Sequence, residues 1–306
     1  MKTKLIRLAA IAFALVLTAL DPAAAQNAFS PDIASPTTAS PTRTDRSIAY
    51  HNGRVLTGTQ IVYVIWYGDW SNDTSQQLLL AEFISRLGSS PYFQINQGYP
   101  NSAGQAPSGD LTFGGSAADA YTHGMALSEA DVADVVANAV LTGGVPLDPS
   151  GIYVVLTSPD VTVIDAVTQF CKTCCNLHGH SEVAGSGFRY VFVGSPLRCP
   201  SICAPRGGQS PNSTYQAGSY EADRMASWLA AALSEVVTDP YDDAWYDRYG
   251  LENAEKCEGT YGETYTVTNE AGQLARANIK LGTRDYLLQQ NWVNGKKGHC
   301  AMSVAQ

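Results

Sequence analysis

Residues 61–67 read Ile-Val-Tyr-Val-Ile-Trp-Tyr, an unbroken apolar run of β-branched and aromatic side chains. Two later runs have the same character: residues 152–157 read Ile-Tyr-Val-Val-Leu-Thr, and residues 188–193 read Phe-Arg-Tyr-Val-Phe-Val. Glycine, serine or proline lies close to the ends of each run, as is typical of strand boundaries. The first two runs are continuously apolar, which predicts strands that are covered on both faces of a sheet.

Helical patterns lie between these strands. Residues 73–87 place leucine, phenylalanine and isoleucine at helical spacing and are followed by a glycine stop signal. Residues 129–141 follow Ser128, a candidate N-cap, and residues 220–237 carry a third apolar stripe. Strands that alternate with helices predict an α/β fold, a layered mixed sheet flanked by helices. The alternation of residues 259–280 predicts a late β-hairpin.

The N-terminal 25 residues have the pattern of a secretory signal peptide. Three basic residues precede the apolar run of residues 8–20, and the alanines at 23–25 offer a cleavage site. A transmembrane anchor is the alternative, but about 13 apolar residues are too few to span about 30 Å of hydrocarbon. Residues 26–46 are rich in proline, serine and threonine, which predicts a disordered leader. We expect residues 47–306 to form a single globular domain without a membrane span.

The composition describes an acidic chain with few charges. The formal net charge is −9, and charged residues make up 15% of the sequence. No cluster of lysine and arginine follows the signal peptide, which argues against nucleic acid or an anionic membrane as a partner. Secretion to the extracellular space is therefore the prediction, with an apoplast or cell-wall location if the source is a plant.

Seven cysteines occur in the C-terminal half of the chain: Cys171, Cys174, Cys175, Cys199, Cys203, Cys257 and Cys300. In an exported chain they predict disulfides, and the odd number leaves one thiol free or intermolecular. The alternative is a zinc site, because Cys171 and Cys174 have knuckle spacing and lie near His178 and His180. The export signal favours disulfides, and we expect neither a metal nor a cofactor.

Two sequons predict glycosylation, at Asn72 and at Asn212. Each would be modified on an exposed loop if the host has the machinery. Three-residue motifs also occur often by chance, so neither sequon by itself establishes a glycoprotein.

Sequence motifs for catalysis are few. No Gly-x-Ser-x-Gly elbow leads from a strand into a helix, and no His-Glu-x-x-His motif occurs. Glu235 lies one helical turn after Ala231, and a single carboxylate does not hold a catalytic zinc, which needs about three protein ligands. Asp239 precedes a proline and is typical of a turn, and we expect His178 to lie in a loop with a structural role. Glu235, Asp239 and His178 are therefore weak catalytic candidates.

Several motifs resemble the EXORDIUM, or phosphate-induced, protein family, in order along the chain from about residue 48 to 302. They are Tyr50-His51-Asn52-Gly53, Val62-Tyr63-Val64-Ile65-Trp66-Tyr67-Gly68-Asp69-Trp70-Ser71, Tyr153-Val154-Val155-Leu156-Thr157-Ser158-Pro159-Asp160, Cys199-Pro200-Ser201-Ile202-Cys203, Val237-Thr238-Asp239-Pro240 and Cys257-Glu258-Gly259-Thr260-Tyr261-Gly262.

The resemblance implies a secreted protein of the plant cell-wall space, linked to growth responses and without an established catalytic activity. It also implies that Cys174 is the additional cysteine, because the family pattern matches the other six: Cys171, Cys175, Cys199, Cys203, Cys257 and Cys300.

One departure from the family pattern bears on activity. Relatives resemble zincins in carrying His-Glu-x-x-Glu on this helix, whereas Ala231 and Ala232 stand at the histidine and first glutamate here. The alanines are either a natural loss or a replacement of ligand and base. A metal site on this helix would need a further donor, such as His178 or Glu252, beside Glu235.

The leading hypothesis is a secreted, non-catalytic EXORDIUM-like protein that binds a cell-wall polysaccharide or a secreted protein in growth or environmental response. The alternative is a zincin-like metal-dependent hydrolase, a peptidase, in an inactive form and with a zincin-like, disulfide-stapled fold. A purely structural wall component is the third hypothesis.

Overall fold

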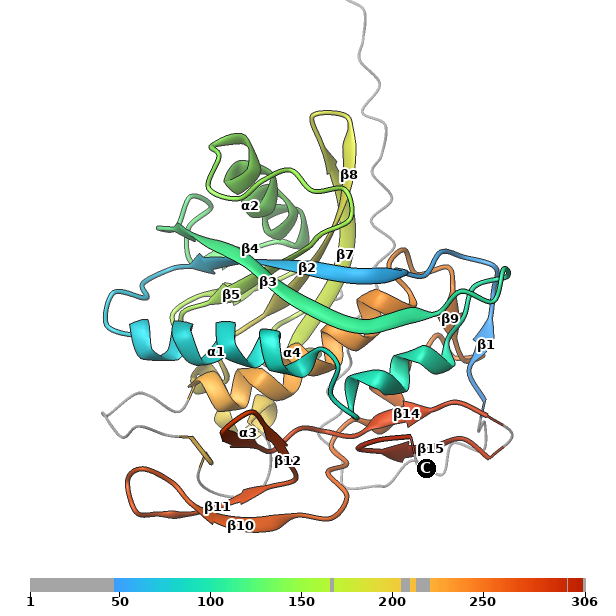
Figure 1. Cartoon of the computed structure of the whole chain (residues 1–306). Coiled ribbons are helices and arrows are strands. Elements are labelled where there is room, and N and C mark those ends of the chain that lie inside the picture. The colour runs from blue at the N-terminus through green and yellow to red at the C-terminus, as the bar shows by residue number, and fades with distance from the viewer. Residues whose placement is uncertain (1–46, 166–167, 205–209, 213–220, 296, 305–306) are drawn as a thin grey trace, which may run out of the picture.

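The computed structural model describes residues 47–165, 168–204, 210–212, 221–295 and 297–304 (Figure 1). The predicted signal peptide and leader, residues 1–25 and 26–46, lie outside the described residues. Within the described ranges, no helix is long and apolar enough to cross a membrane.

A five-stranded mixed sheet forms the centre of the fold. Its strand order is β3 (Pro107–Asp119), β2 (Gly58–Tyr67), β5 (Ile152–Thr157), β8 (Ser186–Val193) and β7 (Asn176–Val183). Neighbouring strands from β3 to β8 run parallel, and only β7 pairs antiparallel, along the edge next to β8. All six residues of β5 are buried, as expected for a central strand that is covered on both faces.

Helices cover both faces of this sheet. Helices α1 (Thr74–Leu87) and α4 (Glu221–Thr238) lie side by side on one face, and α2 (Glu129–Leu141) lies on the other (Figure 1). Helix α2 begins with a capping box, in which the Ser128 side chain accepts from the Asp131 N–H and the Asp131 carboxylate accepts from the Ser128 N–H. The predicted α/β class, with a layered mixed sheet flanked by helices, is confirmed.

Short elements complete the described chain: β1 (Ala49–Tyr50) with β9 (Trp245–Tyr246), β4 (Ala126–Leu127) with β6 (Thr162–Val163), β10 (Tyr265–Thr268) with β11 (Leu274–Ala277), β12 (Ile279–Leu281) with β13 (Arg284–Tyr286), β14 (Asn291–Val293) with β15 (His299–Ala301), α3 (Pro200–Cys203), and the 3-10 turns η1 (Phe93–Gly98), η2 (Pro196–Arg198) and η3 (Glu255–Cys257). The β10–β11 hairpin confirms the one predicted within residues 259–280.

Two strands of the central sheet, β3 and β7, are not predicted from the sequence. Strand β3 contains three glycines and is only half-buried over much of its length. Strand β7 reads Asn-Leu-His-Gly-His-Ser-Glu-Val, which has little strand propensity. The expectation that His178 and His180 lie in a loop is wrong, because both belong to β7. Pairing with β8 through a tight turn at Ala184 and Gly185, both with positive φ, makes this segment a strand.

Three disulfides cross-link the chain, which confirms the prediction of disulfide bonds. Cys171 pairs with Cys199, Cys175 with Cys203, and Cys257 with Cys300. Cys174 remains a buried thiol. The alternative of zinc at the cysteine cluster fails, because Cys171 is oxidised and cannot offer a thiolate beside Cys174.

The Cys174 thiol is expected to be inert in the folded protein. It is fully buried, and burial together with the charge of Glu129 raises its pKa to about 12. At pH 8 roughly one such thiol in ten thousand is ionised, and only the thiolate reacts. A thiol reagent should therefore label no cysteine in the native protein and one after unfolding without reductant. Labelling of the native protein within minutes would contradict this buried assignment.

The free energy of unfolding is expected to fall as pH rises from mildly acidic to alkaline values, and Glu258 is one cause. Burial raises the pKa of this carboxyl to about 8, and the charge of Glu255 adds to the rise. In the unfolded chain the Glu258 carboxyl has an ordinary pKa of about 4.3. The folded state therefore has its full advantage from the protonated carboxyl below that pH. This advantage is lost as pH rises towards 8, by at most about 1.4 kcal/mol per pH unit.

Urea unfolding of Glu258→Gln at several pH values tests this prediction. Between pH 6 and 8 the variant should show a shallower decline than the parent, whereas a control Glu263→Gln, at an exposed position, should decline as the parent does. The same pH dependence in Glu258→Gln and in the parent would contradict the assignment.

Candidate functional site: an open hollow and a buried cluster

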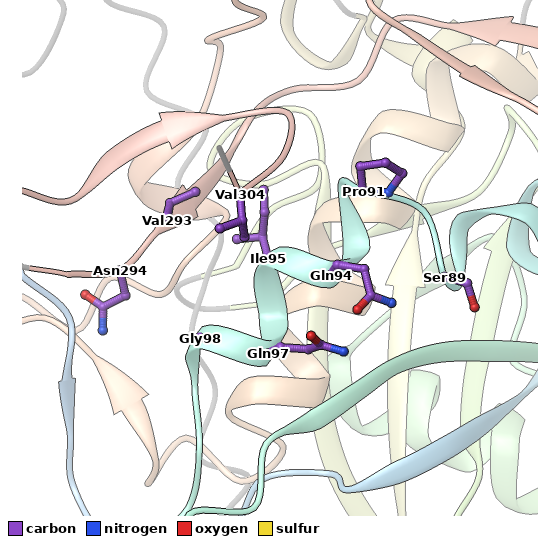
Figure 2. Close-up of a pocket in the computed structure, with 9 residues that line it drawn as sticks. All are labelled: Ser89, Pro91, Gln94, Ile95, Gln97, Gly98, Val293, Asn294 and Val304. Carbon is purple, nitrogen blue, oxygen red and sulfur yellow. The ribbon is translucent and has the colours of Figure 1, made fainter. Parts of the chain in front are cut away.

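An open hollow of about 580 Å³ lies between η1 and the C-terminal segment that carries β14 (Figure 2). Nine residues line it: Ser89, Pro91, Gln94, Ile95, Gln97, Gly98, Val293, Asn294 and Val304. None of the nine is charged, and three carry side-chain amides. The Gln97 amide donates to the Ser108 carbonyl at 2.8 Å, and the Asn294 amide is bonded to the backbone of Ile48. The lining is therefore uncharged and mostly apolar, and two of its three amides are held in place by hydrogen bonds to the backbone.

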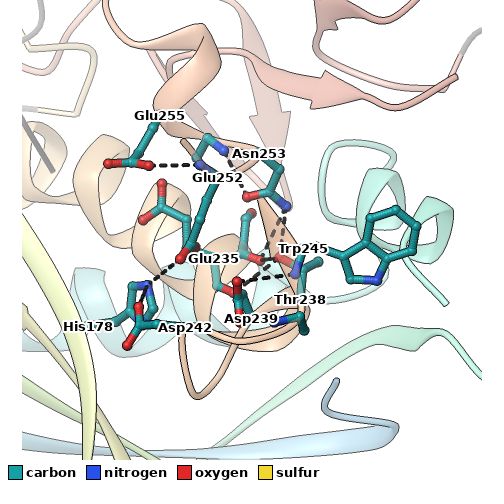
Figure 3. A network of polar contacts seen from close by, with 12 residues as sticks. His178, Glu235, Thr238, Asp239, Asp242, Trp245, Glu252, Asn253 and Glu255 are labelled. Carbon is teal, nitrogen blue, oxygen red and sulfur yellow. Dashed lines mark hydrogen bonds and ion pairs between the residues drawn. The ribbon is translucent and has the colours of Figure 1, made fainter. Parts of the chain in front are cut away.

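A second candidate site is buried, where three distant segments meet. His178 comes from β7, Glu235 from the last turn of α4, and Glu252 from the chain after β9 (Figure 3). His178 Nε2 lies 3.2 Å from Glu252 Oε1. One nitrogen or oxygen of each residue lies within 4.8 Å of those of the others. All three residues are at most 2% exposed.

The turn after α4 closes around Asp239. Its carboxylate accepts backbone N–H groups of Asp243, Ala244 and Trp245 at 2.7, 2.8 and 3.1 Å. This is the turn-forming role that the Asp-Pro pattern predicts. Both carboxylate oxygens of Asp239 are occupied by these hydrogen bonds, so the residue is a poor candidate for catalysis. The turn also brings Asp242 Oδ1 to 3.9 Å from His178 Nε2. Asp242, which the sequence patterns did not single out, is the partly exposed member of this group.

A network of amides holds the segment of Glu252 against α4. The Asn253 Nδ2 group donates to Thr238 Oγ1 at 3.2 Å and to Asn96 Oδ1 at 3.1 Å. The Glu252 N–H donates to Glu255 Oε2 at 2.7 Å (Figure 3). These bonds fix the position of Glu252, so the geometry of the cluster depends on residues outside it.

His178 and Glu252 hold a proton tightly because of the charges and the burial around them. Burial alone lowers the pKa of His178, but the carboxylates of Glu252, Asp242 and Glu235 outweigh it, so this pKa lies well above its usual value. Burial raises the pKa of Glu252 well above its ordinary range, against the charge of His178. The raised pKa values of His178 and Glu252 together describe one proton that the two side chains share. Burial likewise raises the pKa of Asp242 to about 6.

Of the three weak catalytic candidates, the structure brings Glu235 and His178 together and assigns Asp239 to the turn. It also places Glu252, the other donor considered from the sequence, in the same cluster. Ala231 lies one helical turn before Glu235 and is 2% exposed, and Ala232 is fully buried. The donors are therefore present, while the environment around the two alanines is closed.

The two sequons differ in the folded protein. Asn72 is exposed and compatible with a glycan. Asn212 is 8% exposed, and its Nδ2 atom, which would carry a glycan, donates to Asp223 Oδ1 at 2.7 Å and to the Asp285 carbonyl at 2.6 Å. This geometry disfavours Asn212 as an acceptor once the chain has folded.

Comparison with known proteins identifies the family. Residues 48–302 match the model described as the phosphate-induced protein 1 conserved region. Protein EXORDIUM-like 3 of Arabidopsis thaliana is 32% identical over 282 residues, which cover 80% of this chain and 80% of that protein. Protein PHOSPHATE-INDUCED 1 of Nicotiana tabacum is 27% identical over 242 residues, covering 71% and 73% of the two chains. No solved structure matches this chain. The chain therefore belongs to the family of phosphate-induced, or EXORDIUM-like, proteins.

Proposed function

We propose that this chain is a secreted protein that binds a neutral cell-wall polysaccharide and does not act by catalysis. The hollow between η1 and β14 is the observation that carries the proposal. The amides of Gln94 and Gln97 can donate and accept hydrogen bonds and so complement sugar hydroxyls, whereas the Asn294 amide is already bonded to Ile48. The hollow also offers the apolar side chains of Val293 and Val304 to the faces of sugar rings.

Charge favours a neutral polymer over an acidic one. The chain has a formal net charge of −9, and the hollow offers no positive side chain among its nine lining residues. An anionic polysaccharide would be repelled by this overall charge, whereas a neutral glucan or xylan would not. Three disulfides and the predicted signal peptide are compatible with work outside the cell.

The buried cluster supports the non-catalytic part of the proposal. A hydrolytic site needs a general base that reaches the substrate. Ala231 and Ala232 have no ionisable group, and Glu235 and Glu252 are at most 2% exposed. Substrate would have to displace packed side chains to reach either carboxylate.

Retention of the purified chain on insoluble polysaccharides tests the binding proposal. We expect retention on neutral glucan or xylan and little on polygalacturonate. The double variant Gln94→Ala/Gln97→Ala should lose at least tenfold in affinity, while Gln77→Ala, a matched glutamine on α1, should bind as the parent does. No retention on any neutral polymer, or equal retention of the double variant, would count against the hollow as the binding site.

A second candidate function is a zincin-like peptidase that has lost activity. The meeting of Glu235, Glu252 and His178 beside Ala231 favours it, because these are metal-ligating residue types around the altered helix. The variant Ala231→His/Ala232→Glu should then hydrolyse peptides in the presence of zinc. The control Ala231→His/Ala232→Gln lacks the base and should stay inactive. A folded double variant with no activity on a broad peptide mixture would rule against this function.

A further inference from the structure

We propose that the chain, with alanine at positions 231 and 232, binds one zinc ion between His178, Glu235 and Glu252. The inference is independent of the polysaccharide proposal, because the hollow and the cluster share no residue. It also differs from the peptidase proposal, because it requires neither a histidine at position 231 nor hydrolysis.

The geometry of the three side chains suits a single ion. Atoms bound to one zinc at 2.0–2.2 Å in a tetrahedral arrangement lie roughly 3.4 Å from one another. His178 Nε2 and Glu252 Oε1 are already 3.2 Å apart, and all three candidate ligand atoms lie within 4.8 Å of one another. Side-chain rotations that close the wider gaps by about 1 Å would complete the set.

Unpartnered buried atoms point into the same place. Glu252 is 2% exposed, and its second carboxylate oxygen, Oε2, has no hydrogen-bond partner in the part of the chain that the structure describes. Neither oxygen of Asp242 has a hydrogen-bond partner there either. A buried carboxylate oxygen left without a donor is costly, and coordination of a cation removes that cost.

Charge balance favours a divalent ion. With a neutral imidazole, the two ligand carboxylates of Glu235 and Glu252 carry two negative charges, which one divalent cation neutralises. Buried charges are tolerated when they are paired or coordinate a metal. Asp242 Oδ1 lies 3.9 Å from His178 Nε2 and adds a further negative charge beside the proposed site.

The donor set selects zinc over the common alkaline-earth ions. Imidazole nitrogen suits zinc and other late first-row metals, while magnesium and calcium prefer all-oxygen sites with six or more ligands. Three protein donors leave one position open for water in a tetrahedral site. The site would tie β7, the end of α4 and the chain after β9 together, and a metal that binds only the folded chain stabilises it.

Metal titration of the full chain tests the proposal. After removal of metal with a chelator, we expect isothermal titration with zinc chloride and elemental analysis to give one zinc per chain. Zinc should raise the melting temperature, and calcium or magnesium should not. Glu252→Gln and His178→Gln should each weaken zinc binding at least tenfold. Asp134→Asn, in the separate group of His123, Asp131 and Asp134, is the control and should bind as the parent does.

Several results would overturn the assignment. They are the absence of zinc binding by the folded parent, unchanged binding in Glu252→Gln, or loss of binding in Asp134→Asn. If both ligand variants fail to fold, cobalt substitution of the parent decides. Visible absorption typical of four-coordinate cobalt with nitrogen and oxygen ligands is expected, and octahedral cobalt with weak absorption would refute the site. Polysaccharide retention should be the same with and without zinc, so failure of one proposal is visible apart from the other.

Discussion

Asp239→Ala is expected to destabilise the protein by about 4 kcal/mol, since hydrogen bonds to a buried charged group contribute about 1.5–3 kcal/mol each. The Asp239 carboxylate is fully buried and accepts three backbone N–H groups, those of Asp243, Ala244 and Trp245. Alanine would leave these donors unsatisfied at the point where α4 turns towards β9. The loss should appear as a lower midpoint in urea unfolding, followed by far-ultraviolet circular dichroism.

Two variants make this prediction specific. Asp239→Asn keeps one acceptor oxygen and should cost about half as much as alanine. Asp243→Ala removes an exposed carboxylate that accepts the Arg54 N–H at 3.3 Å, and it should cost under about 1 kcal/mol. If Asp239→Ala is no less stable than Asp243→Ala, the turn does not depend on this carboxylate.

The second large effect is expected from removal of the Cys257–Cys300 disulfide. The bond closes a segment with a sequence separation of 43 residues. In the chain-entropy model, a loop of this length corresponds to about 4 kcal/mol of stability. Cys257 also packs in a small core with Ile48, Ile95 and Trp292, so the bond holds the β14–β15 hairpin to the body of the protein.

The double variant Cys257→Ala/Cys300→Ala should therefore unfold at a much lower urea concentration than the parent. Cys174→Ala is the matched control, because it removes a buried cysteine without breaking a disulfide, and should cost about 1 kcal/mol. Hydrogen exchange should show the largest loss of protection in β14 and β15. A double variant as stable as Cys174→Ala would contradict the expected role of the bond.

The helices and the inner strands follow from patterns that are visible in the sequence. Helix α2 illustrates this, because Ser128 and the apolar spacing of the following residues act within a few residues of chain. Strand β5 illustrates it for the sheet, since its six residues are apolar or β-branched and all are buried. Such signals are local, and local preferences are readable wherever they agree with the fold.

The edge of the sheet and the buried cluster depend on contacts between segments that are distant in sequence. The sequence patterns assign β7 to a loop, and pairing with β8 makes it a strand that carries His178 into the interior. His178 and Glu252 are 74 residues apart in the chain. Glu235, His178 and Glu252 could each be named from residue type and the helix pattern, but their meeting could not. Such contacts depend on how the whole core packs, so they cannot be predicted from the residue pattern of any one segment.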